Sequence, residues 1–192
     1  MFKKYWKFFV IFWSVVLVGI IGVFVFFWLI SAGKLGFMPT FEELENPNNR
    51  FASEVYFADG PIMNRYFEKE NRKYIEYREI PQSVIDALIA TEDVRFYDHS
   101  GVDVRGLFRV AKGLLTANTS AGGGSTISQQ LAKMLFPRES DLNVFELAIR
   151  KFREWVIAVR LEKSYTKEEI LTMYLNKYDF LNLAVGISSA AD

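Results

Sequence analysis

The chain has 192 residues, of which 51% are hydrophobic and 16% aromatic, and its 23 basic and 23 acidic residues cancel. A chain this apolar is not a disordered polypeptide, and its length suits one ordinary domain with additional segments. The zero net charge does not indicate a nucleic-acid partner, and the absence of cysteine excludes disulfides, a thiol nucleophile and cysteine-ligated metal sites.

A long apolar segment lies near the N-terminus. Residues 8–30 contain no charged side chain and would form a helix of about 34 Å, enough to cross the hydrocarbon core of a bilayer. Three lysines within residues 1–7 precede the segment and acidic residues follow it, so we expect a cytoplasmic basic stub and an external remainder. A cleaved signal peptide is the alternative, which the length of the run and the poor cleavage sequence Ser31–Gly33 disfavour.

Residues 31–80 are predicted to form a stalk and a membrane-proximal β-hairpin. Glycine and proline residues interrupt any periodicity in the first part of this segment. Two runs with strand-like alternation, Ala52–Ala58 and Ile62–Phe67, then flank the turn sequence Asp59-Gly60-Pro61.

Residues 81–192 have the pattern of a mainly α-helical domain. An amphipathic helix runs from Pro81 to Ala90, and Asp103 is placed to cap a second one. A third helix opens at Ser125 or Thr126 and stops at Pro137. A long helix spans residues 142–163, and a capping box of Thr166 and Glu169 starts the last one.

Carboxylates and the only histidine gather in the sequence TEDVRFYDHSG, Thr91–Gly101. The preceding helix ends at Glu92, so this carboxylate would be held rigidly and still face a cleft. The alternative is that Glu92 and Asp93 are solvated acids at a helix end and that His99 fills a turn. These residues by themselves leave both interpretations open.

The sequence GGGSTISQQLAK, residues 122–133, is a glycine-rich loop that leads into a helix, where free backbone N–H groups favour an anion. It lacks the lysine of a nucleotide-binding P-loop, so no nucleotide cofactor is predicted. Lys133 lies one turn beyond Gln129, where its ammonium would meet a phosphate. The polar residues that cluster at the helix start are Ser125, Thr126, Gln129 and Gln130. An exposed polar helix after a flexible loop is the alternative.

The long helix carries charged residues among its apolar positions. Arg150 and Glu154 are four residues apart and would form an ordinary surface ion pair worth about 0.3–0.5 kcal/mol. A carboxylate among cations, here with Lys151 and Arg153 nearby, is also an arrangement that binds a metal-pyrophosphate or steadies a leaving group. The spacing is compatible with either interpretation.

Four sequence strings together carry a family resemblance: TEDVRFYDHSG, GGSTISQQLAK, RKFREWVIAVRLEKSYTKEEILTMYLN and GISSAA. In order and spacing they resemble the peptidoglycan glycosyltransferases of glycosyltransferase family 51, the transglycosylase domain of class A penicillin-binding proteins and of monofunctional transglycosylases. The resemblance covers Pro81–Ala191 and implies a lysozyme-like transglycosylase domain, expected to be incomplete because the chain stops at Asp192. Met134 and the segment 178–185 depart from the family pattern.

The resemblance implies a role for each candidate residue. Glu92 would be the general base that takes the proton from the 4-hydroxyl of the acceptor sugar, and Glu154 the second essential carboxylate. Lys133, Arg150 and Lys151 would neutralise the departing pyrophosphate, together with a divalent cation, magnesium or manganese. The other candidates would shape the cleft or hydrogen-bond the substrate: Asp93, His99, Ser125, Thr126, Gln129 and Gln130.

The resemblance also implies a reaction and a location. Lipid II would be the acceptor and a glycan strand on undecaprenyl pyrophosphate the donor, joined by a β-1,4 bond with inversion in the bacterial inner membrane. Cell-division or elongation proteins are further expected partners. The alternatives are a lytic transglycosylase, which Glu154 and the cationic residues disfavour, and an inactive membrane fragment that binds lipid II or a cell-wall synthesis partner.

Overall fold

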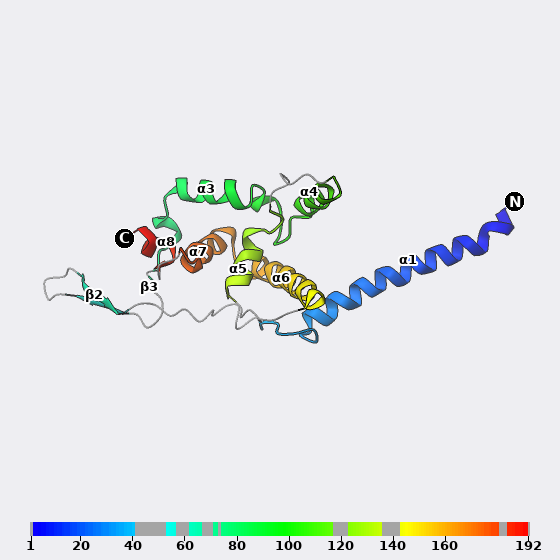
Figure 1. The fold of residues 1–192 in the computed structure, drawn as a ribbon, viewed down its shortest axis with the longest axis horizontal. Helices are drawn as coiled ribbons and strands as arrows, with labels where there is room; N and C mark the ends of the chain where they lie inside the picture. The colour runs from blue at the N-terminus through cyan, green and yellow to red at the C-terminus, as the bar shows by residue number, and fades with distance from the viewer. Residues whose placement is uncertain are drawn as a thin grey trace. The chain divides into compact units, whose positions relative to one another are not determined.

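In the computed structural model the chain forms two compact units. The first contains residues 1–38 and 142–156, and the second contains residues 39–141 and 157–192. Figure 1 gives the order of the elements by colour. The residues that the structure describes are 2–40, 53–56, 62–66, 71–72, 74–116, 123–135, 143–180 and 184–191.

The first unit contains the long helix α1, Phe2–Ser31. Its 27 residues from Tyr5 to Ser31 are long and apolar enough to cross a membrane. Most of their side chains are exposed, and Ile30 near the end of the helix is buried. The helix begins before the predicted segment 8–30 because lysine is a good helix former and the basic stub continues the helix. Apolar side chains exposed along such a length require a nonaqueous environment, as the sequence predicted.

Aromatic side chains pack the end of α1 against α6, Val144–Ser164, within the first unit. The ring of Phe152 lies 5.3 Å from that of Phe26 and 5.8 Å from that of Phe27, in edge-to-face geometry. The indole ring of Trp155 lies 5.1 Å from the ring of Phe152. Edge-to-face aromatic pairs of this kind stabilise a contact beyond the burial of area, by about 0.5–1.5 kcal/mol each.

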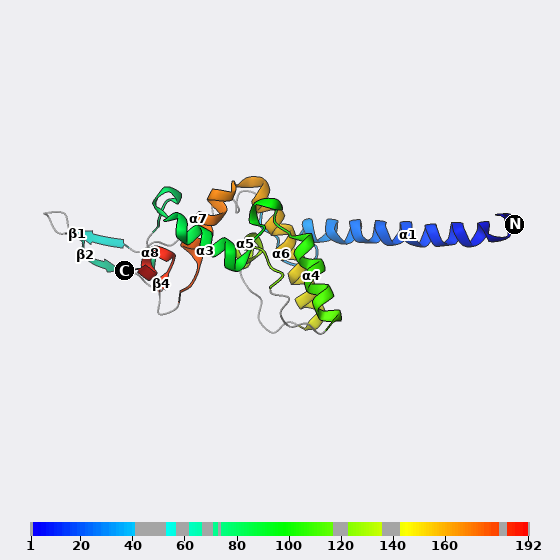
Figure 2. The ribbon, with the colours of Figure 1, turned by 90° about the horizontal axis from the view of Figure 1, so that it is seen from above.

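The predicted hairpin is present in the second unit. Strands β1, Ser53–Tyr56, and β2, Ile62–Tyr66, pair antiparallel with an irregularity between Val55 and Tyr56 (Figure 2). The predicted outer residues Ala52, Ala58 and Phe67 lie outside the described ranges. A parallel pair, β3, Asn71–Arg72, with β4, Ala184–Val185, was not predicted.

The rest of the second unit is helical, which confirms the predicted mainly α class. Two short 3-10 helices, η1 and η2, accompany the α-helices and the end of α6. The ranges are η1 Tyr77–Glu79, α3 Gln82–Glu92, η2 Phe96–Asp98, α4 Val104–Leu115, α5 Ile127–Leu135, α7 Lys167–Lys177 and α8 Ile187–Ala191.

Apolar residues of three helices form much of the core of the second unit. Ile127 and Leu131 of α5 are fully buried, and so are Leu161 of α6 and the α7 residues Ile170 and Leu171. Helices α5 and α7 lie side by side (Figures 1 and 2). This packing brings the polar face of α5 to a fixed position relative to α7.

Two side chains fix the ends of α7. The predicted capping box is present, since the Thr166 side chain accepts a hydrogen bond from the Glu169 N–H and the Glu169 carboxylate accepts one from the Thr166 N–H. At the other end, the Asn176 amide donates to the Ile75 carbonyl and accepts from the Ile75 N–H, both at 2.9 Å. Asn176 thereby ties α7 to the segment that leads into α3.

Asp103 caps α4, as predicted, and also pairs with Arg95. Partial burial alone would raise the pKa of Asp103, but hydrogen bonds from Arg95 and from the Gly106 N–H outweigh it and lower the pKa below its ordinary value. The stabilisation from the ionised carboxylate is therefore complete above about pH 4 and is lost as the pH falls through the lowered folded-state pKa.

Replacing Asp103 tests the cap and the ion pair separately. We expect Asp103→Ala to lower the free energy of unfolding by about 1–2 kcal/mol at pH 7, because the cap is lost. Asp103→Asn keeps the capping oxygen and should lose less. Urea denaturation at pH 7 and at pH 3 measures both variants, and the deficit should shrink at the lower pH. A deficit that grows at pH 3 contradicts this assignment.

Candidate active site

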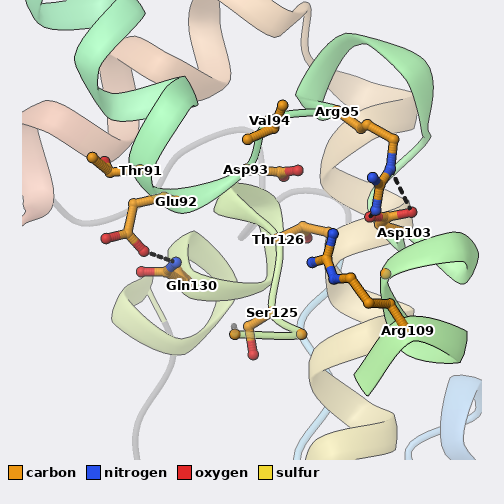
Figure 3. A pocket seen from close by; sticks show the side chains of 13 residues that line it. Thr91, Glu92, Asp93, Val94, Arg95, Asp103, Arg109, Ser125, Thr126 and Gln130 are labelled. Carbon is orange, nitrogen blue, oxygen red and sulfur yellow. Dashed lines mark hydrogen bonds and ion pairs between the residues drawn. The ribbon is translucent and has the colours of Figure 1, made fainter. Parts of the chain in front are cut away.

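Glu92 is the last residue of α3 and stands at the edge of a pocket. The helix ends there because Asp93 has φ −157° and ψ 74°, outside the helical region. The Glu92 side chain is exposed and points toward Gln130 of α5 (Figure 3). The pocket has a volume of about 420 Å³ and is lined by Thr91, Glu92, Asp93, Val94, Arg95, Asp103, Gly106, Arg109, Gly123, Gly124, Ser125, Thr126 and Gln130.

Asp93, the neighbouring acid, is buried and has its partners within the protein. Its carboxylate oxygens lie 3.1 and 3.0 Å from Nε2 of His99, and Oδ2 accepts a hydrogen bond from the Ile127 N–H at 3.1 Å. Ile127 is the first residue of α5, where N–H groups have no partner within the helix and where the helix dipole favours negative charge. Asp93 therefore joins the end of α3 to the start of α5.

Thr126 and Gln129 hold the loop that contains Gly101. The Thr126 hydroxyl donates to the Gly101 carbonyl at 2.7 Å and accepts from the Gln129 N–H, so it caps α5. The Gln129 amide also donates to the Gly101 carbonyl, at 3.4 Å. Gly101 itself has φ +94°, and a Cβ there would lie 2.7 Å from the backbone carbon of Ala158. Only glycine fits this close approach.

A second polar cluster, formed by Lys167, Glu162 and Ser128, fixes the same loop. Lys167 of α7 donates to the His99 carbonyl at 2.8 Å and lies 2.7 Å from the Glu162 carboxylate, which also accepts from the Ser128 hydroxyl. The Lys167 ammonium is 4.2 Å from the centre of the Phe96 ring, a distance at which the cation is attracted to the ring face. Sequence reasoning did not identify Lys167, which has no local signal beyond its position after Thr166.

Two arginines line the pocket and were also missed as site residues. Arg95 pairs with Asp103, and Arg109 extends from α4 toward Thr126 and Ser125 (Figure 3). The placement of Arg105, Arg109 and Lys112 at helical spacing was the signal available in the sequence, since such residues share one face. The pocket thus combines an exposed carboxylate with a cation and a glycine-rich loop.

The predicted cationic and acidic residues of α6 belong to the first unit. Lys151 Nζ lies 2.9 Å from Glu154 Oε2, and Glu154 is only 7% exposed. Glu154 therefore pairs with the residue three positions earlier. The sequence had left open a surface ion pair with Arg150 or a carboxylate among cations that steady a leaving group. Arg150 and Lys151 are half-buried.

The structure brings some predicted site residues together and leaves others apart. Those that share the pocket are Glu92, Asp93, Ser125, Thr126 and Gln130. His99 contacts Asp93 from behind, Gln129 is turned toward Gly101, and Lys133, half-buried in the last turn of α5, does not line the pocket. That Glu154, Arg150 and Lys151 act with Glu92 stays a prediction.

The divalent cation that the resemblance implies has no ready set of protein ligands. Across the described ranges of the chain, no group of three or more His, Asp or Glu side chains is placed to hold a metal ion. A magnesium ion bound with pyrophosphate usually takes one or two carboxylates and completes its shell with phosphate oxygens and water. The described side chains therefore do not by themselves form a set of metal ligands.

Comparison with known proteins gives the family of the chain. The family model described as transglycosylase matches residues 59–192. The matched region begins before Pro81, where the sequence resemblance starts, and includes β2. Penicillin-binding protein 1A of Escherichia coli (strain K12) is 38% identical over 154 residues, 80% of this chain and 17% of the relative. Penicillin-binding protein 1A of Haemophilus influenzae is 37% identical over 163 residues, 85% of this chain and 18% of the relative.

The chain belongs to the transglycosylase family, as the motifs predicted. Penicillin-binding protein 1A of Pseudomonas aeruginosa is 38% identical over 154 residues, 80% of this chain and 18% of the relative. The chain therefore spans less than a fifth of the length of these curated relatives.

Substitution of Asp93 tests its structural part. Asp93→Ala leaves the buried His99 ring and the Ile127 N–H without their acceptor, so we expect the free energy of unfolding to fall by about 2–4 kcal/mol. Asp86→Ala, at an exposed acid of the same helix, is the matched control and should change stability by less than about 0.5 kcal/mol. Urea denaturation of the two variants decides, and equal effects contradict the assignment.

Proposed function

We propose that the chain is a peptidoglycan glycosyltransferase, which joins lipid II to a lipid-linked glycan strand in bacterial cell-wall synthesis. The observation that carries this proposal is the exposed Glu92 carboxylate at the end of α3, in a pocket with Arg109 and the glycine-rich loop. Membership of the transglycosylase family supplies the reaction class.

The reaction follows from placing the acceptor hydroxyl at Glu92. The carboxylate takes the proton of the 4-hydroxyl, and that oxygen attacks the anomeric carbon of the donor strand from the side opposite the leaving group. The new C–O bond is β-1,4. The bond from the anomeric carbon to the α-linked undecaprenyl pyrophosphate breaks, and its electron pair leaves with the pyrophosphate. A single base suffices because pyrophosphate is a good leaving group once its charge is neutralised.

Cations must accompany this step. We assign the neutralising charge to Lys133, Arg150 and Lys151, with Glu154 as the second essential carboxylate that keeps Lys151 oriented through their 2.9 Å ion pair. A divalent cation bound to the pyrophosphate would add to the same neutralisation. Contacts with cell-division or elongation proteins stay a prediction.

Activity on labelled lipid II tests the proposal. The full chain in detergent should produce glycan strands, and Glu92→Gln should lower the rate by about 10²–10⁴-fold, because the amide cannot accept the proton. Asp86→Asn, at an exposed acid of the same helix, should leave the rate unchanged. Strand formation by Glu92→Gln at the normal rate, or release of muropeptides from sacculi by the wild-type chain, would count against it.

We further propose that α1 anchors the protein in the cytoplasmic membrane with its N-terminus inside. The basic stub and the 27-residue apolar span support this topology. Because the chain has no cysteine, single-cysteine variants report the topology directly. In spheroplasts, a membrane-impermeant maleimide should label Ser83→Cys and not Lys3→Cys. The reverse pattern would exclude the proposed orientation.

A further inference from the structure

A chain of two hydrogen bonds connects the interior of α7 to Glu92. The hydroxyl of Tyr174, a residue only 2% exposed, donates to Oε1 of Gln130 at 3.0 Å. The Nε2 group of the same Gln130 side chain donates to Oε2 of Glu92 at 2.7 Å (Figure 3). Three residues from three helices, separated by 38 and 44 positions in sequence, are thus joined in a line.

The two ends of a primary amide are chemically different, and this gives the line a direction. An ionised carboxylate only accepts hydrogen bonds, so Gln130 must present its NH₂ end to Glu92. The phenol hydroxyl donates to the carbonyl end and so favours this orientation of the amide. Without that donor, rotation of the amide would bring its oxygen against the carboxylate, where two acceptors repel.

Tyr174 is suited to remain a donor. Burial, followed by the negative charge of Glu92 and the nearby Tyr178, raises the pKa of the Tyr174 hydroxyl above its ordinary value. The hydroxyl therefore keeps its proton at neutral pH. Tyr174 lies one turn before the end of α7. Asn176 fixes that end through its hydrogen bonds with Ile75.

We propose that Tyr174 is a positioning residue for Glu92 and acts through Gln130. The buried hydroxyl sets the amide, and the amide holds Oε2 of Glu92, which leaves Oε1 as the atom that takes the proton. Within the described part of the chain, Oε1 has no hydrogen-bond partner of its own. This inference rests on the proposed role of Glu92 as the general base, whose efficiency depends on its geometry.

Tyr174→Phe removes the hydroxyl and keeps the ring, so it tests this role with little change in packing. We expect kcat with lipid II to fall about tenfold and KM to change less than about twofold, because the loss concerns the orientation of the base. Tyr178→Phe is the matched control: its ring lies 5.5 Å from that of Tyr174, and its removal of a hydroxyl should leave kcat unchanged.

A double-variant cycle separates positioning from general stability. If Tyr174 acts through Gln130, adding Tyr174→Phe to Gln130→Ala should produce almost no further loss of kcat. A merely structural tyrosine would cause the same fractional loss in either background. Three outcomes would overturn the proposal. One is full additivity of the two substitutions, and another is a Tyr174→Phe variant with normal kcat. The third is a loss of kcat that disappears when the assay temperature is lowered well below the melting temperature of the variant.

A spectroscopic measurement keeps the inference independent of turnover. In the ¹⁵N-labelled full chain in detergent micelles, the side-chain NH₂ resonance of Gln130 should shift in Tyr174→Phe and in Glu92→Gln, but not in Tyr178→Phe. If the wild-type chain makes no glycan strands, the proposed function fails. The Gln130 resonance still shows whether Tyr174, Gln130 and Glu92 are joined by hydrogen bonds. An unchanged Gln130 resonance in Tyr174→Phe overturns the positioning role in either case.

Discussion

The buried carboxylate of Asp93 is the constraint from which the rest of the pocket follows. A charge that is 7% exposed is costly without partners, and here His99 and the Ile127 N–H at the start of α5 provide them. Satisfying Asp93 therefore requires the end of α3 and the start of α5 to meet. Glu92 is the next residue back along the chain, so its approach to Gln130 is a consequence of where Asp93 is held.

Adjacent acids in one motif have opposite environments, and the backbone explains why. The helix stops at Asp93, whose extended backbone turns its side chain inward, whereas Glu92 still has helical geometry and faces the pocket. The Asp93 carboxylate holds elements of the fold together, whereas the Glu92 carboxylate stays exposed at the pocket. The motif alone did not divide the roles of Glu92 and Asp93, and the resemblance implied a base at Glu92 and a supporting role for Asp93. The structure adds the partners through which Asp93 gives that support, His99 and the Ile127 N–H.

Local patterns explain which parts of the fold were predictable. The apolar run of α1, the Thr166 capping box and the antiparallel pairing of β1 with β2 each depend on residues close in sequence, and each was expected from the sequence. The parallel pairing of β3 with β4 and the line from Tyr174 to Glu92 join distant residues, which periodicity does not encode. The choice of Lys151 as partner of Glu154 was equally hidden, because helical geometry allows pairs three or four residues apart.

The described lining of the pocket carries both positive and negative charges. Arg95 pairs with Asp103, and Arg109 adds a second guanidinium group to the lining. The carboxylate of Glu92 lies in the same pocket and opposes the binding of an anion there. A departing pyrophosphate, with several negative charges, therefore requires further cations from outside this lining. The cations proposed for this step, Lys133, Arg150 and Lys151, lie outside the lining, and Lys151 pairs with the nearly buried Glu154.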